Sequence, residues 1–141
     1  MMAGAFDYFQ FVLAPQIVIG LVLGVAVILV ALGLTIIFGL LDVINMSHGE
    51  FYALGAFIGV SLASIGVPFW LLLILVPALM LPIGYLVERV LIQKVFHSPD
   101  RHVTTLLLTF GLALVMEDAF RLIWGPNPIR PETPIRGAVE L

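Results

Sequence analysis

Residues 8–41 read YFQFVLAPQIVIGLVLGVAVILVALGLTIIFGLL, a run of 34 residues without a charged side chain. An α-helix of about 20 apolar residues crosses the hydrocarbon core of a bilayer, so this run is long enough to form a membrane span. Residues 1–10 contain Asp7 but no Lys or Arg, and the apolar run exceeds the length of a signal-peptide core. We therefore expect the first segment to be a retained span rather than a cleaved signal.

Composition extends this expectation to the whole chain. Hydrophobic residues make up 62% of the sequence and charged residues 11%, and the mean hydropathy is +1.19, which is far outside the range of soluble globular domains. The net charge of −3 provides no basic patch for nucleic acid, and a sequence without cysteine has no disulfide or thiol chemistry. The predicted fold class is an all-α integral membrane protein.

The apolar residues fall into four blocks separated by polar or helix-breaking residues. They predict four transmembrane or partly spanning helices at residues 16–41, 51–67, 68–87 and 103–124, followed by a polar, proline-rich loop at residues 125–141. The second block has only 17 residues, near the lower limit for crossing hydrocarbon, so it is predicted to be short or partly sunken. We assign all four blocks to one transmembrane domain.

Basic residues indicate the orientation, because short cytoplasmic connections carry an excess of Lys and Arg. Arg89, Lys94 and Arg101 lie in the connection at residues 88–102, and the earlier connections have no basic residue. We expect this connection to face the cytoplasm and the N-terminus to lie outside, with both tryptophans near the outer interface. Two arginines after the fourth block reduce the bias.

A polar cluster, DVINMSHGE at residues 42–50, separates the first two blocks and predicts a break between their helices. No Lys or Arg lies nearby in the sequence to neutralise its charges. Exposure of these groups to lipid would cost several kcal/mol in total, so they must face protein, a water-filled cavity or an aqueous surface. The candidates for lining a path through the membrane are Asp42, Asn45, Ser47, His48 and Glu50.

Ser47 and Glu50 match the capping box S-x-x-E, in which the serine hydroxyl accepts a hydrogen bond from a helical N–H and the glutamate reaches back to the cap. A helix is predicted to begin here, and its free N–H groups could meet the carboxylate of a passing solute. The alternative is a solvated turn between two ordinary spans. His48 has no second ligand at helical spacing, so no metal site is expected.

Three further patterns are interpreted as structural. Small residues recur four positions apart and predict faces for close helix packing: Gly20 and Gly24, and then Gly55, Gly59 and Ala63. Glu117 and Arg121 have the spacing of an ion pair within one helix. Residues 98–100, Ser-Pro-Asp, predict a helix start with a serine cap.

Residues 33–56, GLTIIFGLLDVINMSHGEFYALGA, closely resemble the YG…INFAHGE…GA signature of the high-affinity branched-chain amino acid permeases. These proteins are the first of the two permease subunits of an ABC importer. The likeness continues at residues 88–90 and 107–118, and it covers most of the chain from residue 20 to residue 124. Met46-Ser47 stands where Phe-Ala is usual.

The resemblance implies a multi-pass permease subunit in the inner or plasma membrane of a prokaryotic cell, forming the translocation path for branched-chain amino acids. It also implies the partners: a second homologous permease subunit, two cytoplasmic ATPase subunits, an extracytoplasmic amino-acid-binding protein and membrane lipid. Such permeases are roughly twice as long, so the chain corresponds to an N-terminal half whose ATPase-coupling loop lies beyond it. No P-loop sequence occurs, and we expect neither enzyme activity nor a cofactor.

Two alternatives stay open at this stage. The chain could belong to an ABC permease for another small polar substrate, such as urea, an amide or a sugar. It could also be a non-transporting membrane scaffold, in which case the polar cluster would be only a turn.

The orientation can be tested by cysteine labelling, because the sequence contains no cysteine of its own. A cysteine replacing Ser98, in the basic connection, is expected to resist an impermeant maleimide in intact cells. A cysteine replacing Ile65, at the predicted outer end of the second block, is expected to react. Equal labelling of the two positions would contradict the predicted orientation.

Overall fold

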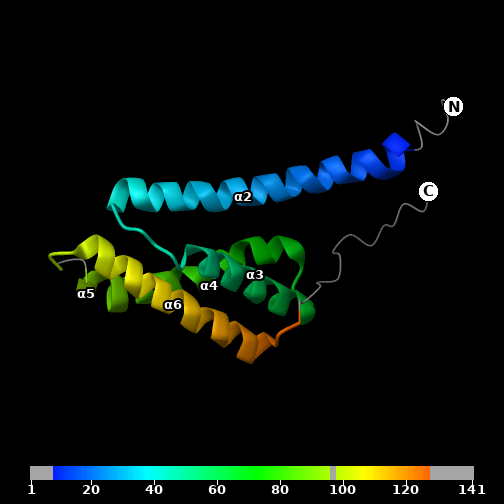
Figure 1. Ribbon diagram of the computed structural model, residues 1–141. Coiled ribbons are helices and arrows are strands. Elements are labelled where there is room, and N and C mark those ends of the chain that lie inside the picture. Colours follow the sequence, from blue (N-terminus) through cyan, green and yellow to red (C-terminus); the bar gives the residue numbers. More distant parts are fainter. Residues whose placement is uncertain (1–7, 96–97, 128–141) are drawn as a thin grey trace. The chain divides into compact units, whose positions relative to one another are not determined.

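The computed structural model describes residues 8–95 and 98–127, and every regular element within these ranges is helical (Figure 1). The chain divides into two compact units, residues 1–41 and residues 42–141. The final part of the predicted proline-rich loop, residues 128–141, lies outside the described residues.

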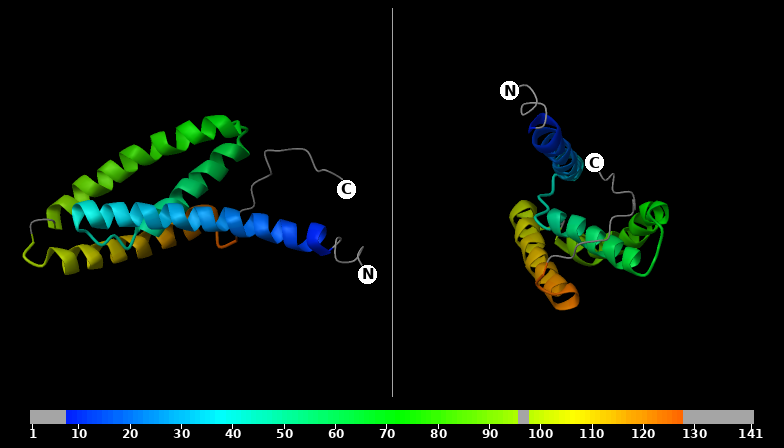
Figure 2. Two further views of the ribbon diagram at one scale, coloured as in Figure 1. Left: turned by 90° about the horizontal axis from the view of Figure 1, so that it is seen from above. Right: turned by 90° about the vertical axis from the view of Figure 1, so that its right-hand side faces the viewer.

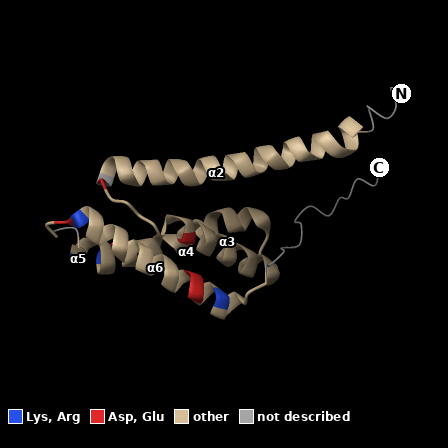
Figure 3. Ribbon diagram, in the orientation of Figure 1, with Lys and Arg blue, Asp and Glu red and all other residues tan. Residues whose placement is uncertain are grey.

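The first unit contains one long helix. A π-helical turn, η1 (Phe9–Leu13), leads into α2 (Ala14–Leu41), whose 28 residues extend about 42 Å at 1.5 Å per residue. No charged side chain occurs along α2 (Figure 3), and the hydroxyl of Thr35 donates to the carbonyl of Ala31 at 2.8 Å. A helix that is apolar on all sides and satisfies its polar groups internally is suited to lipid.

The second unit contains the other three long helices. They are α3 (His48–Ser64), α4 (Phe69–Val87) and α6 (Arg101–Trp124), and α4 continues through the π-helical turn η2 (Glu88–Ile92) into α5 (Gln93–Val95). In this unit α3 packs against both α4 and α6 (Figure 2). The helix α6 also contacts η2 and α5, the segments that continue α4. The short helix α3 is therefore the centre of the unit.

The helices α3 and α6 run in the same direction. The N–H of Met46 donates to Thr109 Oγ1 at 3.0 Å near the start of α3, and Trp124 Nε1 donates to Ser61 Oγ at 2.8 Å near its end. Both hydrogen bonds join residues 63 positions apart, which requires a parallel alignment. The connection before α3 and the connection before α6 thus lie at the same end of the unit.

Close packing joins α3 to α4 at the predicted small-residue face. A Cβ atom added to Gly55 would lie 3.8 Å from Val76 Cγ1, and one added to Gly59 would lie 3.6 Å from Val76 Cγ2. The predicted role of these two glycines in close helix approach is confirmed, whereas a Cβ added to Gly20 or Gly24 would meet no atom of the described residues within 4 Å. The turn between the helices contains Gly66 at a φ of +89°, a conformation that glycine adopts without steric cost.

Aromatic side chains join α3 to α6 at the end away from the polar cluster. The ring of Phe57 lies 5.2 Å from that of Phe120 and 4.9 Å from that of Trp124, centroid to centroid, and the latter pair is stacked. Such pairs contribute about 0.5–1.5 kcal/mol each beyond their buried area. The aromatic cluster and the hydrogen bond from Trp124 to Ser61 fix the end of α6.

The start of α6 differs from the sequence prediction. Asp100, not Ser98, occupies the N-cap position, and no side-chain hydrogen bond caps the helix. The serine cap predicted for residues 98–100 is therefore wrong. The N–H of Ser98 donates to the carbonyl of Val95 at 3.0 Å. The helix ends at Trp124, where Gly125 takes a φ of +85°.

Two helical segments are long and apolar enough to cross a membrane on their own, Phe9–Leu40 and Phe69–Val95. The 17 residues of α3 extend only about 25 Å, less than the ~30 Å of a hydrocarbon core. The 24 residues of α6 include charges near both of its ends (Figure 3). The chain is an all-α membrane protein, and its described residues form four long helices with a break between Leu41 and His48, as predicted.

The contact between α3 and α4 predicts a graded response at Gly59. Replacement by Ala is expected to be tolerated, because 3.6 Å is an ordinary van der Waals distance. Replacement by Leu is expected to destabilise the protein by about 1–3 kcal/mol, because the larger side chain would overlap Val76. Leu at Gly84, where an added Cβ meets no atom within 4 Å, is the matched control. Unfolding in mixed micelles, followed by far-ultraviolet circular dichroism, measures the difference; equal losses for both Leu variants would contradict it.

Candidate functional site

The connection between α2 and α3 is built around Asn45. Its side-chain oxygen Oδ1 accepts hydrogen bonds from the N–H of Ser47 at 3.0 Å and from the Ser47 hydroxyl at 2.7 Å. An asparagine that bonds the backbone two residues on forms an Asx turn, which replaces a backbone turn. This turn places Ser47 at the N-cap position of α3.

The predicted capping box is wrong, although the helix starts where it was expected. No side-chain hydrogen bond caps α3, and the buried hydroxyl of Ser47 donates to Asn45 Oδ1. In a capping box Glu50 would accept from the N–H of Ser47, but this N–H donates to Asn45 Oδ1 instead. The side chain of Glu50 lines a groove between α3 and α6.

The connection is hydrogen-bonded to Thr109 of α6. Thr109 Oγ1 accepts from the N–H of Met46 at 3.0 Å and lies 3.3 Å from the carbonyl oxygen of Ile44, to which it can donate. The most deeply buried side chains among the described residues are Thr105, Thr109 and Ser47, all of them polar. The most buried side chains are therefore polar, and hydrogen bonds of Thr109 join the connection to α6.

An ion pair holds the other end of the connection. Asp42 Oδ2 lies 2.7 Å from Arg101 Nη2 and 3.5 Å from His102 Nε2, at the first turn of α6. Sequence analysis found no cation near Asp42, because its partner comes 59 residues later. The side chains of Asp42 and Arg101 are 54% and 38% exposed, so their attraction is that of a surface pair, about 0–1 kcal/mol in water.

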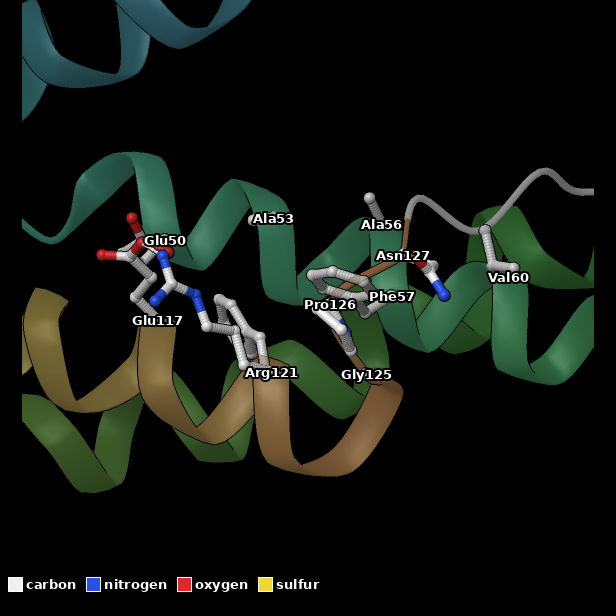
Figure 4. A pocket seen from close by; sticks show the side chains of 11 residues that line it. Glu50, Ala53, Ala56, Phe57, Val60, Glu117, Arg121, Gly125, Pro126 and Asn127 are labelled. Carbon is white, nitrogen blue, oxygen red and sulfur yellow. Dashed lines mark hydrogen bonds and ion pairs between the residues drawn. The ribbon is translucent and has the colours of Figure 1, made fainter.

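A groove of about 770 Å³ lies between α3 and α6 (Figure 4). Charged side chains line one end of it: Glu50 from the first turn of α3, and Glu117 and Arg121 from α6. The predicted ion pair between Glu117 and Arg121 is confirmed, with Oε1 and Nη2 in contact. The rest of the lining is mainly apolar and consists of Ala53, Ala56, Phe57, Val60, Phe120, Gly125, Pro126 and Asn127.

The five candidate residues do not form one cluster. Asn45 and Ser47 bond to each other, Asp42 pairs with Arg101, and Glu50 lies in the groove. His48 is the first residue of α3 and is partly buried. The described residues contain no group of three or more His, Cys, Asp or Glu side chains that could hold a metal ion.

Sequence reasoning missed the two buried threonines. Thr105 and Thr109 lie four residues apart in an apolar stretch of α6, so they share a helix face. Two hydroxyls on one face of a membrane helix are a signal for a polar contact with another segment, and this spacing could have identified them.

Comparison with known proteins gives two matches. Residues 16–135 match the family described as branched-chain amino acid transport system / permease component. The chain is also similar to the high-affinity branched-chain amino acid transport system permease protein BraD of Pseudomonas aeruginosa, with 28% identity over 116 residues. This match covers 76% of the present chain and 37% of the relative, so the chain spans well under two thirds of that protein. No solved structure matches the chain.

The two buried threonines allow a matched test of the contact between α6 and the connection. Replacing Thr109 by Val leaves the N–H of Met46 without its acceptor and is expected to cost about 1–3 kcal/mol of unfolding free energy. The same replacement at Thr105, whose buried Oγ1 has no partner among the described residues, is expected to be neutral or stabilising. Unfolding in mixed micelles compares the two variants, and a larger loss at Thr105 would refute the assignment.

Proposed function

Because the chain belongs to the family of branched-chain amino acid transport system permease components, we propose that it is part of the permease subunit of an ABC importer. The importer takes up branched-chain amino acids across the inner or plasma membrane of a prokaryotic cell. The observation that carries this proposal is the family match over residues 16–135, which covers all four long helices almost completely.

Energy for uptake comes from other subunits in this proposal. The sequence contains no P-loop, G-x-x-x-x-G-K-[ST], and therefore lacks that means of binding ATP. The chain acts as a passive path rather than as an enzyme. Its partners are two cytoplasmic ATPase subunits, a second homologous permease subunit and an extracytoplasmic binding protein that delivers the amino acid.

The connection at residues 42–47 and the start of α3 form part of the path. Non-helical backbone at membrane depth is tolerated only where protein buries it or where it lines a water-filled cavity. Protein supplies partners to this backbone, because Asn45 Oδ1 accepts from the N–H of Ser47 and Thr109 Oγ1 accepts from the N–H of Met46. Asp42 is exposed, and His48 and Glu50 are partly exposed. Buried Ser47 contributes by holding Asn45 in place.

The function is tested in vesicles that contain the complete importer with the full-length form of this subunit. We expect ATP-driven uptake of leucine that requires every partner and disappears when this subunit is omitted. An assembled wild-type importer that binds its delivery protein and hydrolyses ATP, yet takes up no leucine, isoleucine or valine, would refute the proposed substrate class.

The role of the connection is tested in the same vesicles. Replacing His48 by Ala is expected to slow uptake severalfold while assembly and binding of the delivery protein stay normal. Asn45→Ala is expected to slow uptake further, because it also removes the acceptor of both Ser47 hydrogen bonds. Ser64→Ala, at the far end of α3, is the control. If both His48→Ala and Asn45→Ala took up leucine at the wild-type rate, residues 42–50 would not be part of the path and would be only a structural turn.

A further inference from the structure

The groove between α3 and α6 has a charged end that is not electrically balanced. Two carboxylates, Glu50 and Glu117, share it with one guanidinium, Arg121 (Figure 4). Glu117 and Arg121 neutralise each other, and no ion pair of Glu50 occurs within the described part of the chain. A carboxylate in a membrane protein is costly without a partner, so the charged end favours a ligand that brings a positive charge.

Arg121 retains capacity for a second anion. A guanidinium carries five N–H donors, and the ion pair with Glu117 engages Nη2. The remaining N–H groups can donate to another carboxylate at the same end of the groove, while Glu117 keeps the guanidinium in position. The charged end thus offers one site for a cation, at Glu50, and one for an anion, at Arg121.

The other part of the groove is apolar. Ala53, Ala56 and Phe57 line it from α3, and Phe120 lines it from α6. The aromatic contact between Phe57 and Phe120 forms a fixed wall, with ring centroids 5.2 Å apart. Small alanines beside these rings leave room for an aliphatic group.

We propose that this groove is a solute subsite for an α-amino acid with an aliphatic side chain. The ammonium group lies toward Glu50, the carboxylate lies toward Arg121, and the side chain lies along Ala56 and Phe57. The inference rests on the proposed transport function and adds to it the groove that receives the solute. Glu50, the last residue of the polar cluster, belongs to both the path and the subsite.

Other small solutes fit this set of groups less well. A monoanion would meet two carboxylates for one guanidinium, and a simple amine would leave the free donors of Arg121 unused. An uncharged polar molecule would leave Glu50 without compensation. A zwitterion places a group of opposite charge at both Glu50 and Arg121, and an aliphatic side chain matches the apolar wall.

The test uses protection from alkylation in the complete importer, with Ala56 replaced by Cys in a chain that has no other cysteine. Saturating leucine is expected to slow alkylation of this cysteine severalfold. Two analogues are expected to protect much less: 4-methylpentanoate, which lacks the ammonium group, and 3-methylbutylamine, which lacks the carboxylate. A cysteine at Ser64, on the same helix but outside the groove, is the matched control and is expected to show no protection.

A second variant separates charge recognition from mere access. Glu50→Gln in the Ala56→Cys background is expected to abolish protection by leucine, whereas Glu88→Gln, far along the chain in η2, is expected to preserve it. The subsite is wrong if leucine fails to protect the cysteine at position 56 from alkylation. It is also wrong if this cysteine is unreactive in the assembled importer and reactive after denaturation, because another helix would then fill the groove. Either result can occur while the vesicles transport leucine, so the subsite can fail when the proposed function stands.

Discussion

The backbone between α2 and α3 leaves helical geometry, and each of its N–H and C=O groups then needs a partner that the helix no longer provides. In a membrane protein water cannot be relied on for this purpose. Asn45 supplies a partner to the N–H of Ser47, and Thr109 supplies one to the N–H of Met46. Because Thr109 belongs to α6, the same contacts that satisfy the connection also fix α6 against the start of α3.

This anchoring explains how a groove persists between two helices. The helices α3 and α6 are held together near the start of α3 by Thr109 and near its end by Trp124, Phe57 and Ser61. Between these two contacts, small alanines on α3 leave a space that side chains of α6 only partly fill. Parallel helices with anchors at both ends therefore enclose a lined groove without requiring a large apolar core.

Much of the fold could be predicted because it depends on local sequence. The long apolar runs, the break after Leu41 and the ion pair between Glu117 and Arg121 all follow from residues within a few positions of one another. The pairing of Asp42 with Arg101 could not be predicted, since it joins residues 59 positions apart. The capping box failed for a local reason: the pattern S-x-x-E does not reveal that Asn45 accepts from the Ser47 N–H, which Glu50 would have accepted.

The two kinds of contact at the connection also differ in strength. Residues 44–47 are held by hydrogen bonds to buried groups, whereas Asp42 is held by an exposed ion pair that contributes at most about 1 kcal/mol. Asp42 also has a φ of +53°, a left-handed conformation that is uncommon for a residue with a side chain. A left-handed residue directly after the last helical residue is a common way for a helix to end, so Asp42 both ends α2 and begins the connection.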